Sequence, residues 1–246
     1  MRRFWMFLAL LLAADSLPIM AAEPTPGEQV QQEFVRDRKK EKKEKVLGYW
    51  LYLPKDYVAG GEKKFPLMLF LHGSGERGDD LNKVLIHGPP KLVAAGQDFP
   101  CIIVSPQCPE HQIWNSDILS RLLDDIEEHY SVDKQRICVT GLSMGGFATW
   151  SLGASTPFRF SALAPICGGG RPEWSFQLKH VPISVYHGEI DPGVKLEESQ
   201  KMVDAIQKDG GNIQLTVYPG VEHDSWTQTY ENPAFFEWIL SQKRSE

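Results

Sequence analysis

Short apolar runs alternate with helix-like patterns along most of this chain. The predicted strands cover residues 49–53, 67–71, 101–105, 137–140, 162–166, 183–187 and 213–218. A helix is predicted over 118–130, where the apolar residues form one face, and two later helices include 202–206 and 235–240. Strands that alternate with helices are typical of an α/β fold, in which helices cover both faces of a mostly parallel central sheet.

Length and charge narrow the class of protein. With 246 residues, 42% of them hydrophobic, the chain is long enough for one domain with a sizeable core. The net charge is -6 and no dense Lys/Arg patch lies in the folded part, so nucleic acid is not expected as a partner.

The first 45 residues differ in character from the rest. Arg2 and Arg3 precede an apolar stretch, and small residues follow at Ala21 and Ala22, which predicts a secretory signal peptide over 1–22. Its removal would give a secreted or periplasmic protein without stable membrane association, and an uncleaved anchor is the alternative. Residues 23–45 contain RDRKKEKKEK and are predicted to form a charged linker, solvated or as a frayed helix, ahead of a catalytic domain over 46–246.

The cysteines point to neither a metal motif nor a disulfide scaffold. Cys101, Cys108, Cys138 and Cys167 match the spacing of neither a zinc site nor a small disulfide-rich fold. In an exported chain they can pair, and buried free thiols are the other interpretation. Because the sequence contains no evident cluster of metal ligands, no metal is expected.

The stretch FLHGSGERGDD (70–80) follows an apolar run and contains G-x-G-x-x-G, the spacing of a dinucleotide-binding loop. In such a loop the third glycine opens a helix whose N-terminus faces the pyrophosphate. Here Asp79 and Asp80 follow that glycine and would place carboxylates against the phosphates, while Glu76 and Arg77 fill positions that need small or apolar groups. A nucleotide cofactor is therefore not expected, and the loop needs another explanation.

The sequence GLSMGG (141–146) suggests that explanation. It follows the strand-like RICVT and precedes a helix-compatible run, the setting in which the serine of G-x-S-x-G projects its hydroxyl above a sheet. Gly141 and Gly145 leave room for the tight turn. Ser143 is therefore predicted to be a nucleophile.

A serine nucleophile needs a base and an acid that orients the base, and in this strand–turn–helix class the acid and then the histidine follow the serine in the chain. His223, in PGVEHDSW, is the only one of the 7 histidines that follows all the plausible acids. Asp191, in VPISVYHGEIDPG, is the preferred acid, and Glu189 and Asp224 are its rivals. The predicted catalytic residues are thus Ser143, Asp191 and His223, with the carboxylate holding the Nδ1 proton of the imidazole.

Acyl transfer also creates an oxyanion, which backbone amides stabilise in this architecture. One predicted donor is the amide of Met144, directly after the nucleophile. The HGSG segment fits the second donor, with Ser74 as the first choice and Gly75 as the next. The charged residues that follow in this loop are expected to brace it.

Together with SPQCP, CGGG, HGEID and a closing aromatic helix, these motifs resemble the α/β-hydrolase superfamily over roughly residues 46–243. Within it, the chain is similar to single-domain carboxylesterases, a group with feruloyl- and acetyl-esterase-like, phospholipase/carboxylesterase-like and "predicted peptidase" members. The resemblance implies an α/β-hydrolase fold and a serine carboxylesterase that works through an acyl-enzyme. Because the triad supplies its own base, no cofactor is expected. Relatives often carry Val-Pro soon after the acid, whereas Pro192, Gly193 and Val194 follow it here, which leaves the local loop shape open.

By the same resemblance, the expected substrate is a feruloyl or acetyl ester of a plant polysaccharide, or a related small acyl or aryl ester. Trp114, Trp174 and Trp226 are candidates for substrate contact, since flat aromatic faces suit acyl groups and sugars, and core or loop packing is the alternative. Two other functions remain open. A serine peptidase of prolyl-oligopeptidase type usually adds a propeller domain for which this chain has no room, and a catalytically silent carbohydrate-binding protein has no need of the triad spacing.

Overall fold

A computed structural model gives the fold and describes residues 24–38 and 42–244. The predicted signal peptide over 1–22 lies outside the described residues and stays a prediction.

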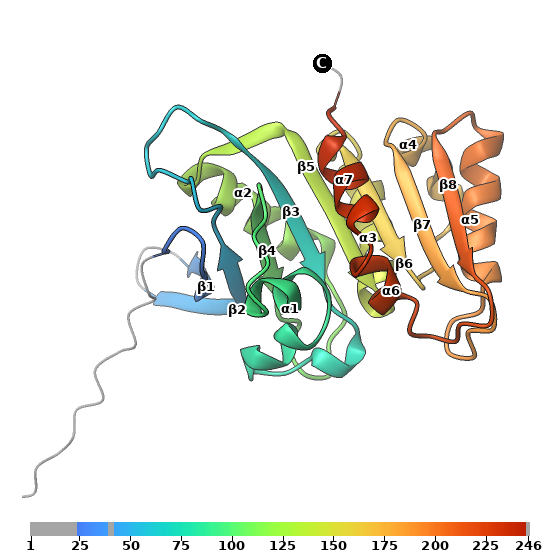
Figure 1. Cartoon of the computed structure of the whole chain (residues 1–246), viewed down its shortest axis with the longest axis horizontal. Helices are drawn as coiled ribbons and strands as arrows, with labels where there is room; N and C mark the ends of the chain where they lie inside the picture. Colours follow the sequence, from blue (N-terminus) through green and yellow to red (C-terminus); the bar gives the residue numbers. More distant parts are fainter. Residues whose placement is uncertain (1–23, 39–41, 245–246) are drawn as a thin grey trace, which may run out of the picture.

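The described residues form one eight-stranded sheet with the order β1-β2-β4-β3-β5-β6-β7-β8 (Figure 1). Its strands are β1 (Gln29–Arg38), β2 (Lys42–Tyr52), β3 (Phe65–Leu71), β4 (Ile102–Pro106), β5 (Val132–Leu142), β6 (Ala162–Ile166), β7 (Ile183–Gly188) and β8 (Ile213–Tyr218). The pairs β1–β2 and β2–β4 are antiparallel, and every other pair is parallel. All the carboxyl ends from β3 to β8 therefore lie at the same edge of the sheet.

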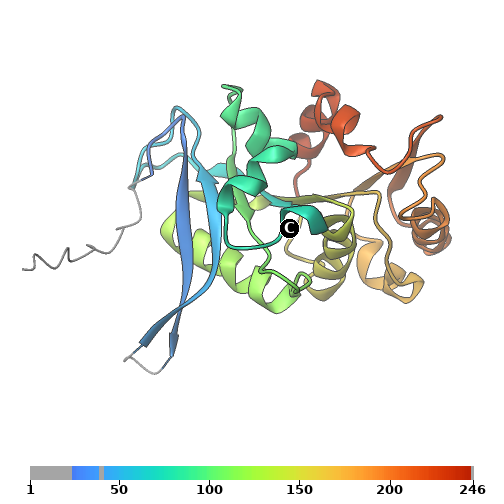
Figure 2. The same cartoon turned by 90° about the horizontal axis from the view of Figure 1, so that it is seen from below.

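Helices form a layer on each face of the sheet. The α-helices of the described part are α1 (Gly88–Ala94), α2 (Ser116–His129), α3 (Met144–Ser155), α4 (Ser175–Leu178), α5 (Glu197–Lys208), α6 (Trp226–Tyr230) and α7 (Pro233–Ser241). Short 3₁₀ helices are η1 (Ser74–Glu76), η2 (Leu81–Ile86) and η3 (Pro172–Trp174). In Figure 2, α1, α6 and α7 lie on one side of the sheet and α2, α3 and α5 on the other.

The alternation of side chains along buried strands explains these two layers. In β3, Leu67, Leu69 and Leu71 join the hydrophobic cluster under α2, α3 and α5, while Met68 and Phe70 join the cluster with α6 and α7. Every residue of β3 is buried, as expected for a central strand covered on both faces. The predicted α/β class is confirmed: the sheet is mostly parallel, and all seven predicted strands lie within or overlap an observed one.

The prediction of a charged linker over 23–45 is wrong for its described part. Residues from Gln29 onward form β1, which pairs with β2 from Gln29↔Tyr52 to Arg38↔Lys42, and the predicted domain start at residue 46 falls inside β2. The apolar side chains of Val30 and Phe34 pack against the core. Charged residues are common on an edge strand, where they discourage pairing with other chains, so charge content misidentified this segment.

The structure also describes the state of the cysteines and the length of the apolar helices. All four cysteines are free and buried, so no pairing is seen for them. Within residues 24–38 and 42–244, no helix has the length and apolar character needed to cross a membrane.

Candidate active site

Ser143 lies in the turn between β5 and α3 with a strained backbone. Its φ of 52° and ψ of -115° are rare for a residue with a side chain. The glycines around it make the turn possible. A Cβ at Gly145 would lie 1.9 Å from the carbonyl oxygen of Leu71, and a Cβ at Gly141 would lie 2.5 Å from that of Gly145. The G-x-S-x-G pattern is therefore a steric requirement of this turn.

The three predicted catalytic side chains meet at the carboxyl ends of β5, β7 and β8. The Nε2 atom of His223 lies 2.9 Å from Oγ of Ser143, and its Nδ1 atom lies 2.7 Å from Oδ2 of Asp191. These separations are within hydrogen-bond reach for a nucleophile, a base and an orienting acid. The order of the groups permits proton transfer from the serine hydroxyl to the imidazole.

Asp191 is fixed more firmly than its rivals. Its Oδ1 atom accepts the amide protons of Gly193 and Val194 at 2.8 and 2.9 Å, and its side chain is fully buried. Burial alone raises the pKa of this carboxyl, but the hydrogen bonds from His223 and the two amides outweigh it, so the pKa lies below its usual 3.8. Asp191 therefore stays ionised when it faces the imidazole.

Glu189 and Asp224, the rival acids, have other partners. The carboxylate of Glu189 accepts the amide of Gly220 at 2.8 Å. That of Asp224 accepts the amide and hydroxyl of Thr227 at 3.0 and 2.9 Å, at the start of α6. Both acids are exposed.

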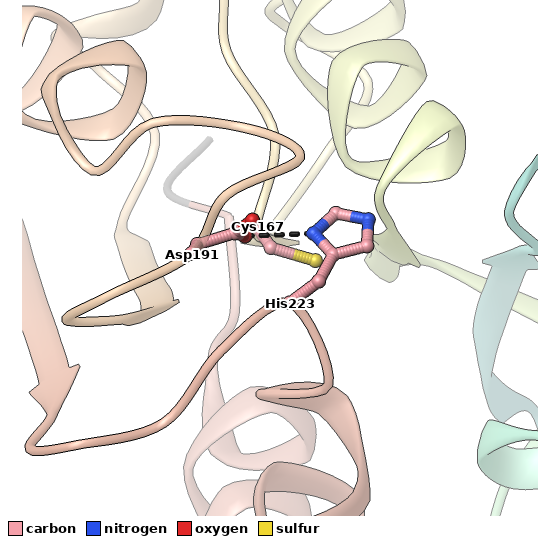
Figure 3. Close-up of side chains that lie close together, drawn as sticks. All are labelled: Cys167, Asp191 and His223. Atoms are coloured by element: carbon pink, nitrogen blue, oxygen red, sulfur yellow. Dashed lines mark hydrogen bonds and ion pairs between the residues drawn. The ribbon is translucent and has the colours of Figure 1, made fainter.

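Two further groups surround the imidazole of His223. The ring of Trp226 packs edge-on against it with centroids 5.3 Å apart. On another side lies the buried Cys167, one residue past the end of β6, with a φ of 39°. Figure 3 shows Cys167 beside the Asp191–His223 pair. Burial raises the pKa of this thiol to about 12, so it is neutral at ordinary pH. The sequence motif CGGG contained Cys167, but no role was predicted for it.

Glu76 and Arg77 brace the HGSG loop, as predicted for these two residues. The amide of Gly73 donates to Glu76 at 2.9 Å, and Arg77 Nε donates to the carbonyl of Ser74 at 2.9 Å. His72 is fully buried, and the amide of Cys108 donates to its Nε2 at 2.9 Å, so its proton lies on Nδ1, 2.6 Å from the carbonyl of Gly73. Burial lowers the pKa of His72 to about 4, which keeps the ring neutral.

The predicted oxyanion donors are placed at the starts of two helices. Met144 is the first residue of α3, and Ser74 and Gly75 begin η1 at the end of the loop after β3. Amides in the first turn of a helix have no acceptor within that helix, so they are available to a ligand. The roles of Ser74, Gly75 and Met144 as donors stay a prediction.

A cavity of about 600 Å³ opens beside Ser143 and is mostly apolar. Its lining includes Ile113, Trp114, Ser143, Met144, Phe147, Ala148, Ser151, Gly169, Gly170, Arg171 and Trp174. Two of the three predicted tryptophans are thus in the cavity, and the guanidinium of Arg171 lies 6.0 Å from the ring centre of Trp174. Trp226 is not among the lining residues: it lies between His223 and His87, with the two ring centroids 5.3 and 5.4 Å away. Its predicted contact with substrate stays a prediction beside this packing against the two histidines.

Comparisons with known proteins give the family and the fold. The model of the dienelactone hydrolase family matches residues 108–234, which is 127 of 246 residues. A solved thermostable esterase is 31% identical, with a TM-score of 0.74, over 87% of this chain and 63% of its own length. Poly(3-hydroxyalkanoate) depolymerase C of Paucimonas lemoignei is 39% identical over 51 residues, which are 21% of this chain and 12% of the depolymerase. The chain therefore spans less than two thirds of either relative.

A more distant structure supports the fold alone. The feruloyl esterase module from Clostridium thermocellum is 15% identical with a TM-score of 0.62, over 91% of this chain and 92% of the module. The matched family segment includes Ser143, Asp191 and His223. This chain therefore belongs to the dienelactone hydrolase family of the α/β-hydrolase superfamily.

Proposed function

We propose that this protein is a serine carboxylesterase that forms an acyl-enzyme on Ser143. The observation that carries the proposal is the continuous hydrogen-bonded chain from Ser143 through His223 to Asp191, at the mouth of the cavity of about 600 Å³. A hydroxyl, a base and an ionised, buried acid in this order are the parts that nucleophilic acyl transfer requires.

In the first step, Nε2 of His223 takes the proton of Ser143 while Oγ attacks the ester carbonyl carbon. The amide of Met144 and one from Ser74 or Gly75 stabilise the resulting oxyanion. His223 then gives its proton to the leaving alcohol, and the acyl group stays on Oγ. A water molecule, deprotonated by His223, attacks the acyl-enzyme and releases the acid. Asp191 holds the Nδ1 proton throughout and stabilises the imidazolium.

The cavity supports an aromatic or short acyl ester as substrate. Trp114, Trp174 and Phe147 offer flat apolar faces beside the nucleophile, and Ile113 is 76% exposed at the rim. Such faces bind phenolic rings and sugar faces alike. We therefore propose feruloyl or acetyl esters of plant polysaccharides as substrates. The signal-like residues 1–22 support a secreted or periplasmic location, where such polymers are accessible.

Hydrolysis assays with a matched pair of serine variants test this function. The substrates are p-nitrophenyl acetate, methyl ferulate and acetylated xylan, with a peptide p-nitroanilide as the amide counterpart. Ser143→Ala removes the nucleophile and is expected to lower kcat about 10⁴-fold or more. Ser151→Ala is the control: Ser151 lines the same cavity, but its hydroxyl bonds to the carbonyl of Ala148 at 3.1 Å and to Ser116 at 3.3 Å.

The outcomes separate the candidate functions. Ester cleavage that depends on Ser143 and survives in Ser151→Ala supports the esterase. Faster cleavage of the peptide amide than of any ester would favour a peptidase instead. If no substrate is cleaved and polysaccharide still binds, the protein is a binding module on a hydrolase fold.

A further inference from the structure

Cys167 is a buried thiol beside the catalytic pair that the proposed reaction does not use. Cys167, Asp191 and His223 follow the carboxyl ends of β6, β7 and β8, three adjacent parallel strands, so the sheet brings them together although they are far apart in the sequence. One ligand atom of each residue lies within 4.8 Å of the other two. Figure 3 shows the sulfur and the carboxylate next to the imidazole edge that carries Nδ1.

These three side chains offer the donor atoms that zinc selects. A thiolate sulfur, an imidazole nitrogen and a carboxylate oxygen are all common zinc ligands, and three protein ligands leave one position open for solvent. The charges also balance, since a thiolate and a carboxylate together neutralise a divalent cation. A metal site with no net charge suits this location, because the side chains of Asp191 and Cys167 are buried.

We propose that Cys167, Asp191 and His223 form a zinc-binding site that switches the hydrolase off by occupying Nδ1 of the catalytic histidine. In the active state Nδ1 of His223 holds a proton that it shares with Asp191 at 2.7 Å. A zinc ion on Nδ1 takes the place of that proton. The metal-bound and active states therefore exclude each other.

Zinc binding would inhibit the enzyme by changing which nitrogen of His223 carries the proton. When zinc binds, the thiol of Cys167 loses its proton to solvent and the Nδ1 proton of His223 moves to Nε2 by way of solvent, so the ring stays neutral. One proton is released for each zinc ion bound, and the charge of the site changes from -1 to zero. The Nε2 atom, 2.9 Å from Oγ of Ser143, then carries a hydrogen and no free lone pair. It can no longer accept the serine proton, even though the cavity stays open.

The geometry requires a modest rearrangement. With zinc–sulfur bonds of about 2.3 Å and zinc–nitrogen or zinc–oxygen bonds of about 2.1 Å, tetrahedral ligands lie roughly 3.4–3.6 Å apart. The Asp191–His223 pair at 2.7 Å must open by less than 1 Å, and ligand atoms now up to 4.8 Å apart must approach by about 1 Å. Side-chain rotation of His223, which is 31% exposed, supplies this movement.

The nearby imidazole of His187 is already engaged and does not compete for the metal. His187 lies close, with Nε2 at 3.4 Å from Oδ2 of Asp191, but its two nitrogens already contact the carbonyl of Val194 at 2.8 Å and the hydroxyl of Ser199 at 2.7 Å. Because Cys167 and Asp191 are buried, zinc has to enter from the side of His223. The inhibition is therefore expected to develop slowly after mixing.

The test compares two variants of the full chain, in each of which one cysteine is replaced by alanine. Cys167→Ala removes the proposed ligand and keeps a Cβ at the same backbone position. Cys108→Ala removes another buried thiol, in the segment between β4 and α2. Each protein is freed of metal with a chelator and titrated with Co²⁺, which replaces zinc and gives a thiolate-to-metal absorption band when sulfur is a ligand. Hydrolysis is then followed over time after addition of Zn²⁺.

The wild type and Cys108→Ala are expected to bind one cobalt ion with a thiolate band and to lose activity progressively in zinc, with recovery on chelation. Cys167→Ala should show no band and need at least about tenfold more zinc for half inhibition, relative to its own zinc-free rate. Absence of the band in the wild type would overturn the proposal, as would equal zinc sensitivity of Cys167→Ala. The cobalt band and a zinc-dependent rise in Tm are read without any substrate, so they test this site even if the proposed esterase activity fails.

Discussion

Replacement of Asp191 by asparagine tests the catalytic geometry most directly. The two carboxylate oxygens have different partners: Oδ1 accepts the amides of Gly193 and Val194 at 2.8 and 2.9 Å, and Oδ2 faces Nδ1 of His223 at 2.7 Å. The NH₂ group of asparagine can only donate, so the amide oxygen must keep the position that accepts the two backbone amides. The new NH₂ group therefore points at His223.

This orientation of the asparagine side chain changes the tautomer of His223. With a donor opposite it, Nδ1 of His223 becomes an acceptor and the ring proton moves to Nε2, the atom 2.9 Å from Oγ of Ser143. The base then has no lone pair for the serine proton. In serine triads the wrong tautomer lowers kcat by about 10⁴-fold, equivalent to about 5 kcal/mol of transition-state stabilisation. KM is expected to change little, because Asp191 does not line the cavity.

The assay is the steady-state hydrolysis of p-nitrophenyl acetate at neutral pH, with Tm as a check on folding. Glu189→Gln is the matched control, since this carboxylate in the same loop accepts the amide of Gly220 at 2.8 Å. It should keep kcat within a few-fold of the wild type. If Asp191→Asn retains more than a tenth of the wild-type kcat, the tautomer argument is refuted and Asp224→Asn becomes the next variant to measure.

Two further predictions concern stability. Burial lowers the pKa of His72 to about 4, against 6.5 in the unfolded chain. Between these two pH values the unfolded chain binds more protons than the folded protein. The contribution of His72 to the free energy of unfolding is therefore complete above pH 6.5 and falls by about 3 kcal/mol as the pH drops to 4. Chemical unfolding as a function of pH should show this slope in the wild type and lose it in His72→Asn. Gly145→Ala places a Cβ 1.9 Å from a backbone oxygen and should cost about 3 kcal/mol or more, whereas Gly75→Ala meets nothing within 4 Å and should change the free energy of unfolding by less than about 0.5 kcal/mol. Equal Tm values for these two glycine variants would contradict the steric account of the turn.

The sequence predicted β3 and β6 because these strands are apolar throughout. In β3 and β6 every residue is buried, so continuous apolar runs marked them clearly. It could not reveal β1, because an edge strand with charged side chains resembles a solvated linker. The pairing of β1 with β2 depends on the register between them, which composition does not encode.

The positions of the site residues were predictable to different degrees. Ser143 is marked by a local steric pattern, and Asp191 and His223 follow from their places after strands of a parallel sheet. Trp226 could not be assigned, because its contact with His223 depends on the path of the loop before α6. Cys167 was overlooked for a similar reason: its neighbours in space come from two other strand ends, and nothing in CGGG indicates which side chains they bring.

The three proposed catalytic side chains are held by different forces, and this difference links the proposed reaction to the proposed zinc site. Ser143 is fixed by a backbone turn that leaves no room for a Cβ at Gly145, and Asp191 by two amide protons in a fully buried position. The side chain of His223 is 31% exposed and is held by a hydrogen bond on each nitrogen and by ring packing. A base that exchanges protons with both serine and leaving alcohol benefits from such freedom. The same freedom lets the ring turn toward Cys167, so a metal that captures Nδ1 acts on the group that the fold holds least firmly.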